Sequence, residues 1–273
     1  WNSLIVGYAK LKDSKSALSL YQKMSKLDES LHLGVPAFMA LLKACTLLKN
    51  VKTGQILHAK INERGLLDFD VFIGCSLVDM YANCGFLEKA YELHKELPVR
   101  SVVSWSAIIV GYAHQGQGQK ALNCFKQMKS DGFCPDDVTI LCVLSACGRS
   151  GLLDEAQMLF GNMTQEYGIT PSIDHQTCMV VALGSAGHFD KAISVIKAMP
   201  SAEYAAVWVA LLGACRKWGN LKLGTLAFDQ VLQLDNCCVE AYVLMANIFA
   251  NAGMPEDKEN VETMGLKYGS IGN

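Results

Sequence analysis

The stretch WNSLIVGYA at residues 1–9 recurs as WSAIIVGYA at residues 105–113, an offset of 104 positions. Two other stretches recur at an offset of 102 positions: LLKAC at 41–45 returns as VLSAC at 143–147, and DMYANCGFLEKA at 79–90 returns as VALGSAGHFDKA at 181–192. A fixed period of small apolar units indicates a solenoid, in which each unit buries its apolar face against its neighbours. We therefore expect a long repeated surface, and not a single pocket, to carry the function.

Nearly every unit has the pattern of two amphipathic helices. In the first unit Leu4, Ile5 and Tyr8 recur at helical spacing, and a polar break at residues 12–15 separates them from a second apolar run that starts at Ala17. Later units carry glycine in the same break, which suits a short turn between two helices. The predicted fold is all-α: a right-handed α-solenoid of helix-turn-helix repeats.

The units alternate between three lengths. Six repeats are expected over residues 1–204, and two further helical pairs over residues 205–273, the last with a degenerate end. The expected bounds of the six repeats are 1–34, 35–70, 71–101, 102–136, 137–172 and 173–204.

Composition narrows the function classes. The chain of 273 residues is 51% apolar and 18% charged, so it is globular and not disordered. Its net charge of -2 and pI near 6.3 argue against a generic basic nucleic-acid binder, but not against a reader of single strands that uses base edges. The 11 cysteines lie mostly in apolar helical runs, which favours reduced thiols in an intracellular compartment. No apolar stretch reaches membrane length, so no membrane contact is expected.

Four strings carry a family resemblance: WSAIIVGYAHQGQGQKALNCFKQMKSDGFCPDDVTILCVLSAC, GLLDEAQMLF, IDHQTCMVVALGSAG and AVWVALLGACRKWGNLKLG. They resemble a plant pentatricopeptide-repeat (PPR) protein of the PLS subclass, whose P, L and S repeats follow one another with 35, 36 and 31–32 residues. AVWVALLGACRKWGN followed by AYVLMANIFANAG is similar to the E-type motifs that close such proteins. The resemblance thus implies a fragment of an organellar RNA editing factor that lacks upstream repeats and the DYW deaminase domain.

The resemblance implies single-stranded organellar RNA as the main partner. In this family each repeat faces one base, and the fifth residue of the first helix and the last residue of the repeat select it. Carried over to this sequence, the base-selecting pairs are Asn2 with Gly34, Met39 with Asp70, Cys75 with Ser101, Ser106 with Asp136, Leu141 with Ser172, and Thr177 with Tyr204.

The side-chain chemistry separates good pairs from poor ones. The Ser106 hydroxyl and the Asp136 carboxylate suit a purine edge that offers a donor, and the family pattern implies guanine. Asn2 offers both a donor and an acceptor, and in the family it favours pyrimidines. Cys75 is a weak hydrogen-bonding group, and Met39 and Leu141 of the two L-type repeats are expected to be loose readers. Tyr204 departs from the Asp or Asn that is usual in the family at that position.

We expect no catalytic activity, no cofactor and no metal site. Zinc deaminases combine His-x-Glu with Pro-Cys-x-x-Cys, and His94-Lys95-Glu96 matches only the first half. Trp105 and Trp208 could stack on bases, but their apolar neighbours at helical spacing favour packing between units. Lys120, Lys126 and Lys129 could line a phosphate path, although a solvated face is the simpler interpretation.

Two functions stay open from the sequence. The leading one is a sequence-selective RNA-binding module that specifies C-to-U editing sites in a mitochondrion or chloroplast and recruits a deaminase-bearing protein and accessory editing factors in trans. The alternative is a helical-repeat adaptor that binds only proteins, in an organellar RNA-processing or ribosomal assembly. In the final helical pairs the candidate reading positions hold Val209 and Leu244 or nearby apolar groups, which are poor partners for base edges, so we expect these pairs to dock protein and to cap the array.

Overall fold

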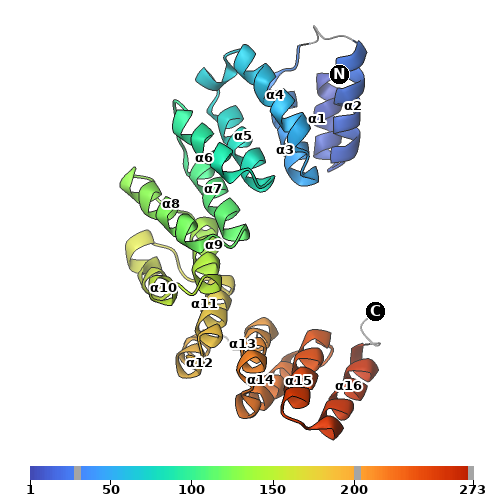
Figure 1. Ribbon diagram of the computed structural model, residues 1–273, viewed down its shortest axis with the longest axis vertical. Helices are drawn as coiled ribbons and strands as arrows, with labels where there is room; N and C mark the ends of the chain where they lie inside the picture. The colour runs from blue at the N-terminus through green and yellow to red at the C-terminus, as the bar shows by residue number, and fades with distance from the viewer. Residues whose placement is uncertain (28–31, 200–203, 270–273) are drawn as a thin grey trace. The chain divides into compact units, whose positions relative to one another are not determined.

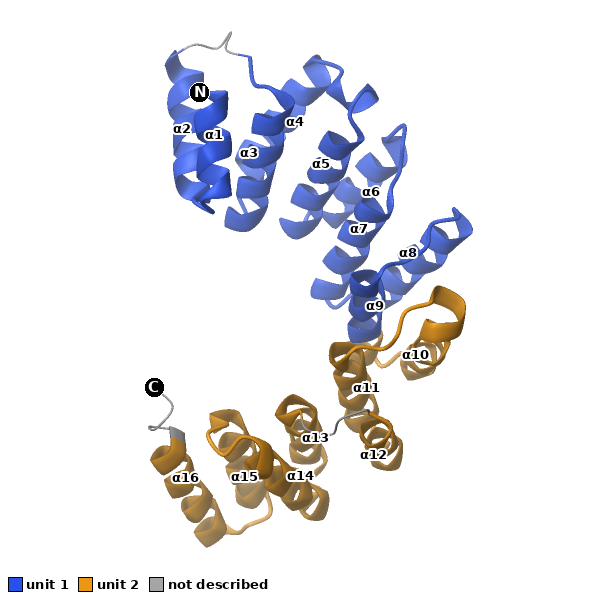
Figure 2. Cartoon of the chain, turned by 180° about the vertical axis from the view of Figure 1, so that it is seen from behind, with its two compact units in different colours: residues 1–146 blue, residues 147–273 orange. Residues whose placement is uncertain are grey.

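The computed structural model describes residues 1–27, 32–199 and 204–269, and within these residues it contains sixteen α-helices and one short 3-10 helix, with no strand (Figure 1). The predicted all-α class is confirmed. The chain divides into two compact units, residues 1–146 and 147–273, which Figure 2 shows in different colours.

Unit 1 is built from helical pairs in two layers. The first helix of each pair contacts the first helix of the next, so that α1 lies against α3, α3 against α5 and α5 against α7. The second helices α2, α4 and α6 each pack against their own first helix and against the first helix that follows it. The helices are α1 (Asn2–Lys10), α2 (Ser14–Leu27), α3 (Val35–Leu48), α4 (Val51–Glu63), η1 (Leu66–Asp68), α5 (Val71–Asn83), α6 (Leu87–Glu96), α7 (Val102–His114), α8 (Gly118–Ser130) and α9 (Asp137–Arg149), which contains the boundary.

Unit 2 repeats the same plan. Its first helices contact one another in the order α11, α13, α15, and each pairs with the second helix that follows it in the chain. The helices are α10 (Leu153–Tyr167), α11 (Ile173–Ser185), α12 (Phe189–Lys197), α13 (Ala205–Trp218), α14 (Leu221–Leu234), α15 (Val239–Asn251) and α16 (Pro255–Gly269). Stacked helical pairs are the arrangement that the predicted α-solenoid class requires.

The turns inside the pairs follow from glycine and from helix ends. Gly85 and Gly116 have φ angles of 90° and 71°, a left-handed region in which a Cβ would be strained, so each reverses the chain after a first helix. Side chains then join neighbouring turns. Gln115 Nε2 donates to the carbonyl of Gly85 at 3.0 Å, and Lys217 Nζ donates to that of Ser185 at 2.8 Å. These bonds satisfy carbonyls at helix C-termini that have no partner in their own helix.

Aromatic residues fill the spaces between the pairs. Trp105 is 1% exposed and Trp208 is 8% exposed, which confirms that both pack in the core. Trp105 meets the ring of His94 at 4.2 Å between centroids, with the planes inclined by 63°. No helix among the described residues has the length and apolar character needed to cross a membrane.

Candidate nucleic-acid interface

The expected reading residues lie at the N-terminal ends of the first helices. Met39, Cys75, Ser106, Leu141 and Thr177 are the fifth residues of α3, α5, α7, α9 and α11. The last residue of each expected repeat directly precedes the first helix of the next. These residues are Gly34, Asp70, Ser101, Asp136, Ser172 and Tyr204. A pair therefore consists of one residue on a first helix and one residue at the start of the following first helix. Asn2 is the first residue of α1.

The last residues have a structural task that the family resemblance did not suggest, since most of them cap helices. Asp70 Oδ1 accepts from the backbone N–H groups of Phe72 at 2.8 Å and Ile73 at 3.2 Å. Ser101 Oγ accepts from the Ser104 N–H at 3.3 Å. Capping satisfies N–H groups that the first turn of a helix leaves open. A carboxylate can cap with one oxygen and keep the other for a ligand, whereas a serine has a single oxygen for both tasks.

Ser106 and Asp136 are joined through a third residue, Thr139. Ser106 Oγ lies 2.6 Å from Thr139 Oγ1, and that hydroxyl also hydrogen-bonds Asp136 Oδ1. Asp136 Oδ1 accepts from the Thr139 N–H as well, at 2.8 Å. Asp136 is exposed, Ser106 is half-buried and Thr139 is fully buried. Both bonds to the carboxylate use Oδ1, so Oδ2 is left to accept from a ligand.

Cys75 and Ser101 also meet. Cys75 Sγ lies 3.1 Å from Ser101 Oγ, and Cys75 is only 6% exposed. The thiol therefore faces the capping serine and presents little polar surface. This geometry agrees with the expectation that the pair discriminates weakly between bases.

Asn2 and Gly34 approach each other at the start of the chain. Asn2 Nδ2 donates to the carbonyl of His32 at 3.1 Å, and its Oδ1 is buried without a hydrogen bond among the described residues. A Cβ built on Gly34 would lie 3.8 Å from Asn2 Nδ2, so the glycine contributes no side chain to this pair. Of this expected pair, only Asn2 supplies a polar side chain.

The other expected pairs are less well formed. Met39 and Leu141 are half-buried apolar side chains. The Thr177 hydroxyl donates to the carbonyl of Ile173 at 2.8 Å, and among the described residues no hydrogen bond joins it to Tyr204. Tyr204 is 49% exposed and makes no side-chain capping bond to α13. Ser172 lies 2.7 Å from His175 Nδ1, a capping contact.

Sequence reasoning missed two further sets of residues at this surface. The second residues of α5, α7 and α9 are apolar yet strongly exposed: Phe72 at 70%, Val103 at 63% and Val138 at 55%. The third residues of α7, α9 and α11 are polar yet fully buried: Ser104, Thr139 and His175. Ser104 and His175 each form a capping box with the residue three positions before them, and the Thr139 N–H donates to Asp136 at the same spacing. A polar residue three positions after a capping residue is the sequence signal that could have identified the second set.

In the final helical pairs the expected reading positions hold apolar residues. Leu244 is buried, whereas its neighbour Val243, 54% exposed, is the fifth residue of α15. Val239, Val243 and Leu266 line a groove of about 380 Å³ between α15 and α16. Its lining is mainly apolar, as expected for a contact with protein and not with base edges.

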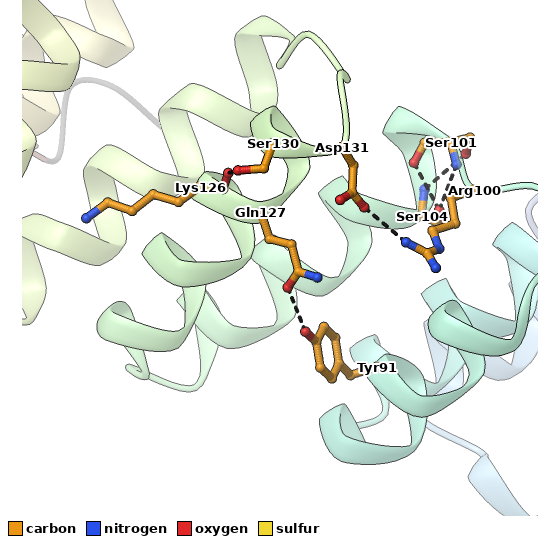
Figure 3. Close-up of polar contacts among 8 residues, drawn as sticks. All are labelled: Tyr91, Arg100, Ser101, Ser104, Lys126, Gln127, Ser130 and Asp131. Carbon is orange, nitrogen blue, oxygen red and sulfur yellow. Dashed lines mark hydrogen bonds and ion pairs between the residues drawn. The ribbon is translucent and has the colours of Figure 1, made fainter.

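Polar contacts on the second-helix layer occupy several of the charges. Figure 3 shows Tyr91 donating to Gln127 Oε1 at 2.9 Å, and Arg100 paired with Asp131 at 3.0 Å. Lys120, expected near a phosphate path, pairs with Glu88 Oε1 at 2.9 Å. These residues hold α6 and its following loop against α8. They belong to a different layer from the reading residues, which lie on first helices.

His94 is buried in this layer, and its surroundings do not resemble those of a ligand to a catalytic zinc ion. Both ring nitrogens lack a hydrogen-bond partner among the described residues. The pKa of His94 is lowered from 6.5 to about 4, chiefly by burial and to a smaller extent by the nearby Arg100, while Asp131 opposes the shift. No group of three His, Cys, Asp or Glu in the described part of the chain could hold a metal ion.

Comparison with known proteins gives a consistent assignment. The profile described as "PPR repeat family" matches residues 100–149, and the profile described as "PPR repeat" matches residues 1–28, 75–102, 138–167 and 177–203. Together they cover more than half of the chain.

Curated relatives from Arabidopsis thaliana share this description. One pentatricopeptide repeat-containing protein is 37% identical over 264 residues, which is 97% of this chain and 32% of the relative. A chloroplastic relative is 34% identical over 98% of this chain and 32% of its own length, and a mitochondrial one is 36% identical over 96% of this chain and 41% of its own length. The chain thus spans about a third of the length of the first of these relatives.

Solved structures support the fold. The crystal structure of the pentatricopeptide repeat protein PPR10 from maize superposes with a TM-score of 0.63 at 17% identity, covering 96% of this chain and 38% of that protein. PPR10 in complex with an 18-nt psaJ RNA element gives 0.61 at 16% identity, covering 98% of this chain and 45% of that protein.

Proposed function

Because this chain belongs to the pentatricopeptide-repeat family, we propose that it binds single-stranded RNA in a sequence-selective way, reading one base per repeat without catalysis of its own. One solved neighbour, PPR10, has been crystallised in complex with an RNA element, which supports RNA as the partner. The reading residues proposed for this chain are the fifth residues of the first helices and the residues that precede the following first helices.

One observation carries the proposal, namely the surroundings of Ser106 and Asp136. Their hydroxyl and carboxylate are linked through the Thr139 hydroxyl near the N-terminal ends of α7 and α9, and both bonds to the carboxylate use Oδ1 and leave Oδ2 for a ligand. The exposed side chains of Val103 and Val138 stand one helical turn or less away along the same two helices. A flat base can rest on such apolar side chains while its edge meets the polar pair, which is how single-strand readers combine contact and selection.

We further propose that the RNA is an organellar transcript and that binding specifies a site of C-to-U editing. The relatives named chloroplastic and mitochondrial support an organellar location. The order of the repeat lengths and the E-type ending support the editing role, with a deaminase-bearing protein and accessory editing factors acting in trans. The apolar groove between α15 and α16 offers a surface for such a protein.

The test is an RNA selection in vitro at a stated salt concentration, with the whole chain and with the Ser106→Ala/Asp136→Ala double variant. Salt has to be fixed because phosphate contacts make affinity salt-dependent. We expect the wild-type chain to enrich guanine at one fixed position, and the double variant to lose that enrichment. A chain that binds all single strands equally would refute sequence-selective reading.

The second candidate function is a helical-repeat adaptor that binds only proteins. The specific observation in its favour is the α15–α16 groove, together with the poorly formed pairs at Cys75 and Tyr204. RNA affinity that is unchanged in the Ser106→Ala/Asp136→Ala variant would favour this alternative over base reading.

A further inference from the structure

We propose that Thr139, which is too deeply buried to touch RNA, sets the base preference of the Ser106–Asp136 pair by fixing the direction of the Ser106 hydroxyl. This inference rests on the proposed function, because it concerns how one repeat reads its base. In this proposal Thr139 is a positioning residue that acts through Ser106 and Asp136, the two residues of the pair.

The assignment follows from counting protons. Ser106 and Thr139 have one hydroxyl proton each, while Asp136 is an acceptor only. Ser106 Oγ has two oxygen neighbours, Thr139 Oγ1 at 2.6 Å and the carbonyl of Val102 at 2.8 Å. Thr139 Oγ1 also has two oxygen neighbours, Ser106 Oγ and Asp136 Oδ1. A bond to a carboxylate is stronger than one to a neutral oxygen, so Thr139 donates to Asp136.

The proton of Ser106 then lies between the two hydroxyls. Two oxygens at 2.6 Å repel each other unless a proton separates them, and the Thr139 proton is already on the Asp136 side. Ser106 therefore donates to Thr139, which donates to Asp136. The carbonyl of Val102, at 2.8 Å, is a second acceptor that competes for the same proton. With its proton held by Thr139, Ser106 faces the base as an acceptor.

Two acceptors select a particular base edge. Ser106 Oγ and Asp136 Oδ2 together need two adjacent donors on the Watson–Crick edge of the base. Guanine supplies N1–H and the N2 amino group side by side. Adenine pairs its N6 amino donor with an N1 acceptor, so one of the two contacts becomes repulsive. With Thr139 in place, the pair accepts guanine and rejects adenine.

The neighbouring repeat shows that a buried hydroxyl at this helical position does not do this by default. Ser104 is the third residue of α7, as Thr139 is of α9. Its hydroxyl turns back to its own cap, donating to the Ser101 carbonyl at 2.9 Å and accepting from the Ser101 N–H at 3.2 Å. Ser104 is therefore a matched control: it is equally buried and equally placed, but it is not bonded to the fifth residue of the preceding first helix.

The experiment measures dissociation constants for two RNAs that differ only by guanine or adenine at the position found in the selection. The proteins are the whole chain and its Thr139→Val, Thr139→Ser and Ser104→Ala variants. Valine keeps the shape of threonine without the hydroxyl. In Thr139→Val the Ser106 hydroxyl loses its acceptor on residue 139, and the Val102 carbonyl and adenine N1 then compete for its proton, so adenine RNA should bind several-fold more tightly. We expect the guanine preference to fall from roughly tenfold or more to about threefold or less.

The variants separate the possible results. Thr139→Ser should keep the wild-type preference because it keeps the hydroxyl, and Ser104→Ala should keep it because Ser104 is not part of the chain of bonds. Tighter binding of adenine RNA cannot arise from partial unfolding, so it supports the inference even if Thr139→Val is less stable. Equal weakening for both RNAs, with an unchanged ratio, would overturn the inference and leave the proposed function standing. A wild-type chain with no base preference would refute both.

Discussion

Replacement of His94 by leucine should remove a large part of the acid sensitivity of this protein. The His94 ring is completely buried against Trp105, and burial lowers its pKa from 6.5 to about 4 in the folded state. The unfolded chain takes up a proton on this histidine near pH 6.5, whereas the folded chain does so only near pH 4. Because the unfolded state binds more protons between these values, the stability contributed by neutral His94 falls as the pH falls through this window.

The magnitude follows from the size of the shift. A pKa difference from 6.5 to about 4 corresponds to about 3 kcal/mol of unfolding free energy, of which about 2 kcal/mol is already lost at pH 5. Leucine cannot titrate, so the variant keeps this part of its stability. At pH 7.5 leucine loses the ring contact with Trp105 but also removes two unpaired nitrogens, so the variant should lie within about 1 kcal/mol of the wild type.

The assay is urea unfolding of both proteins at pH 7.5 and at pH 5.0. At a single pH, the two proteins differ in unfolding free energy by the packing change plus the effect of His94 titration. The change of this difference between the two pH values reports His94 titration alone, because the two proteins share all other titrating groups. We expect the variant to gain about 2 kcal/mol on the wild type when the pH is lowered from 7.5 to 5.0. Parallel pH profiles would refute the reasoning and would mean that the His94 ring reaches water or a polar partner in solution.

Three further predictions concern packing and thiols. Gly184→Ala should destabilise the protein by about 1–3 kcal/mol in urea unfolding, because the new Cβ would lie 2.6 Å from the Cβ of Ala214 and neither atom can rotate away. Gly161→Ala is the matched change in open space, with nothing within 4 Å, and should stabilise by about 0.5–1 kcal/mol in the same assay. In iodoacetamide labelling followed by mass spectrometry, exposed Cys134 should react first, and Cys215, whose pKa is raised by burial to about 12, should react only on unfolding. Equal labelling rates for these two thiols would contradict the packing of α13.

The fold was predictable from the sequence because its signals are local and repeated. Apolar spacing and glycine breaks occur in unit after unit, and the structure confirms helical pairs and the buried positions of Trp105 and Trp208. Helix starts are less well marked. Before α15 the sequence reads DNCC, without glycine or proline, so the sequence left open whether Leu244 or a neighbouring apolar residue is the fifth residue of α15, and the structure has Val243 there. The bounds of the repeats stay predictions.

The site was predictable only as a set of positions. The family resemblance proposes Ser106 and Asp136 as a reading pair, but the hydrogen bonds that link them pass through Thr139, which lies 33 residues from Ser106 and was not part of the expected pattern. A second case is the burial of His94. His94 looks like half of a deaminase motif in the sequence, and only its contact with Trp105 shows that it is a core residue. Both cases depend on contacts between neighbouring repeats, which the sequence of a single repeat does not encode.

The position of Asp136 at the start of α9 has a consequence for recombination between repeats. The residue counts as the end of one repeat, yet its carboxylate is held by the third residue of the next. A crossover or a designed graft that joins chains directly after residue 136 would bring in a new residue at position 139. The transplanted repeat would keep Ser106 and Asp136 but would lose the hydrogen bonds that Thr139 makes to both of them. Joining after residue 139 would move the three partners together. The segment that has to be transferred to keep the base preference would then end three residues after the end of the repeat.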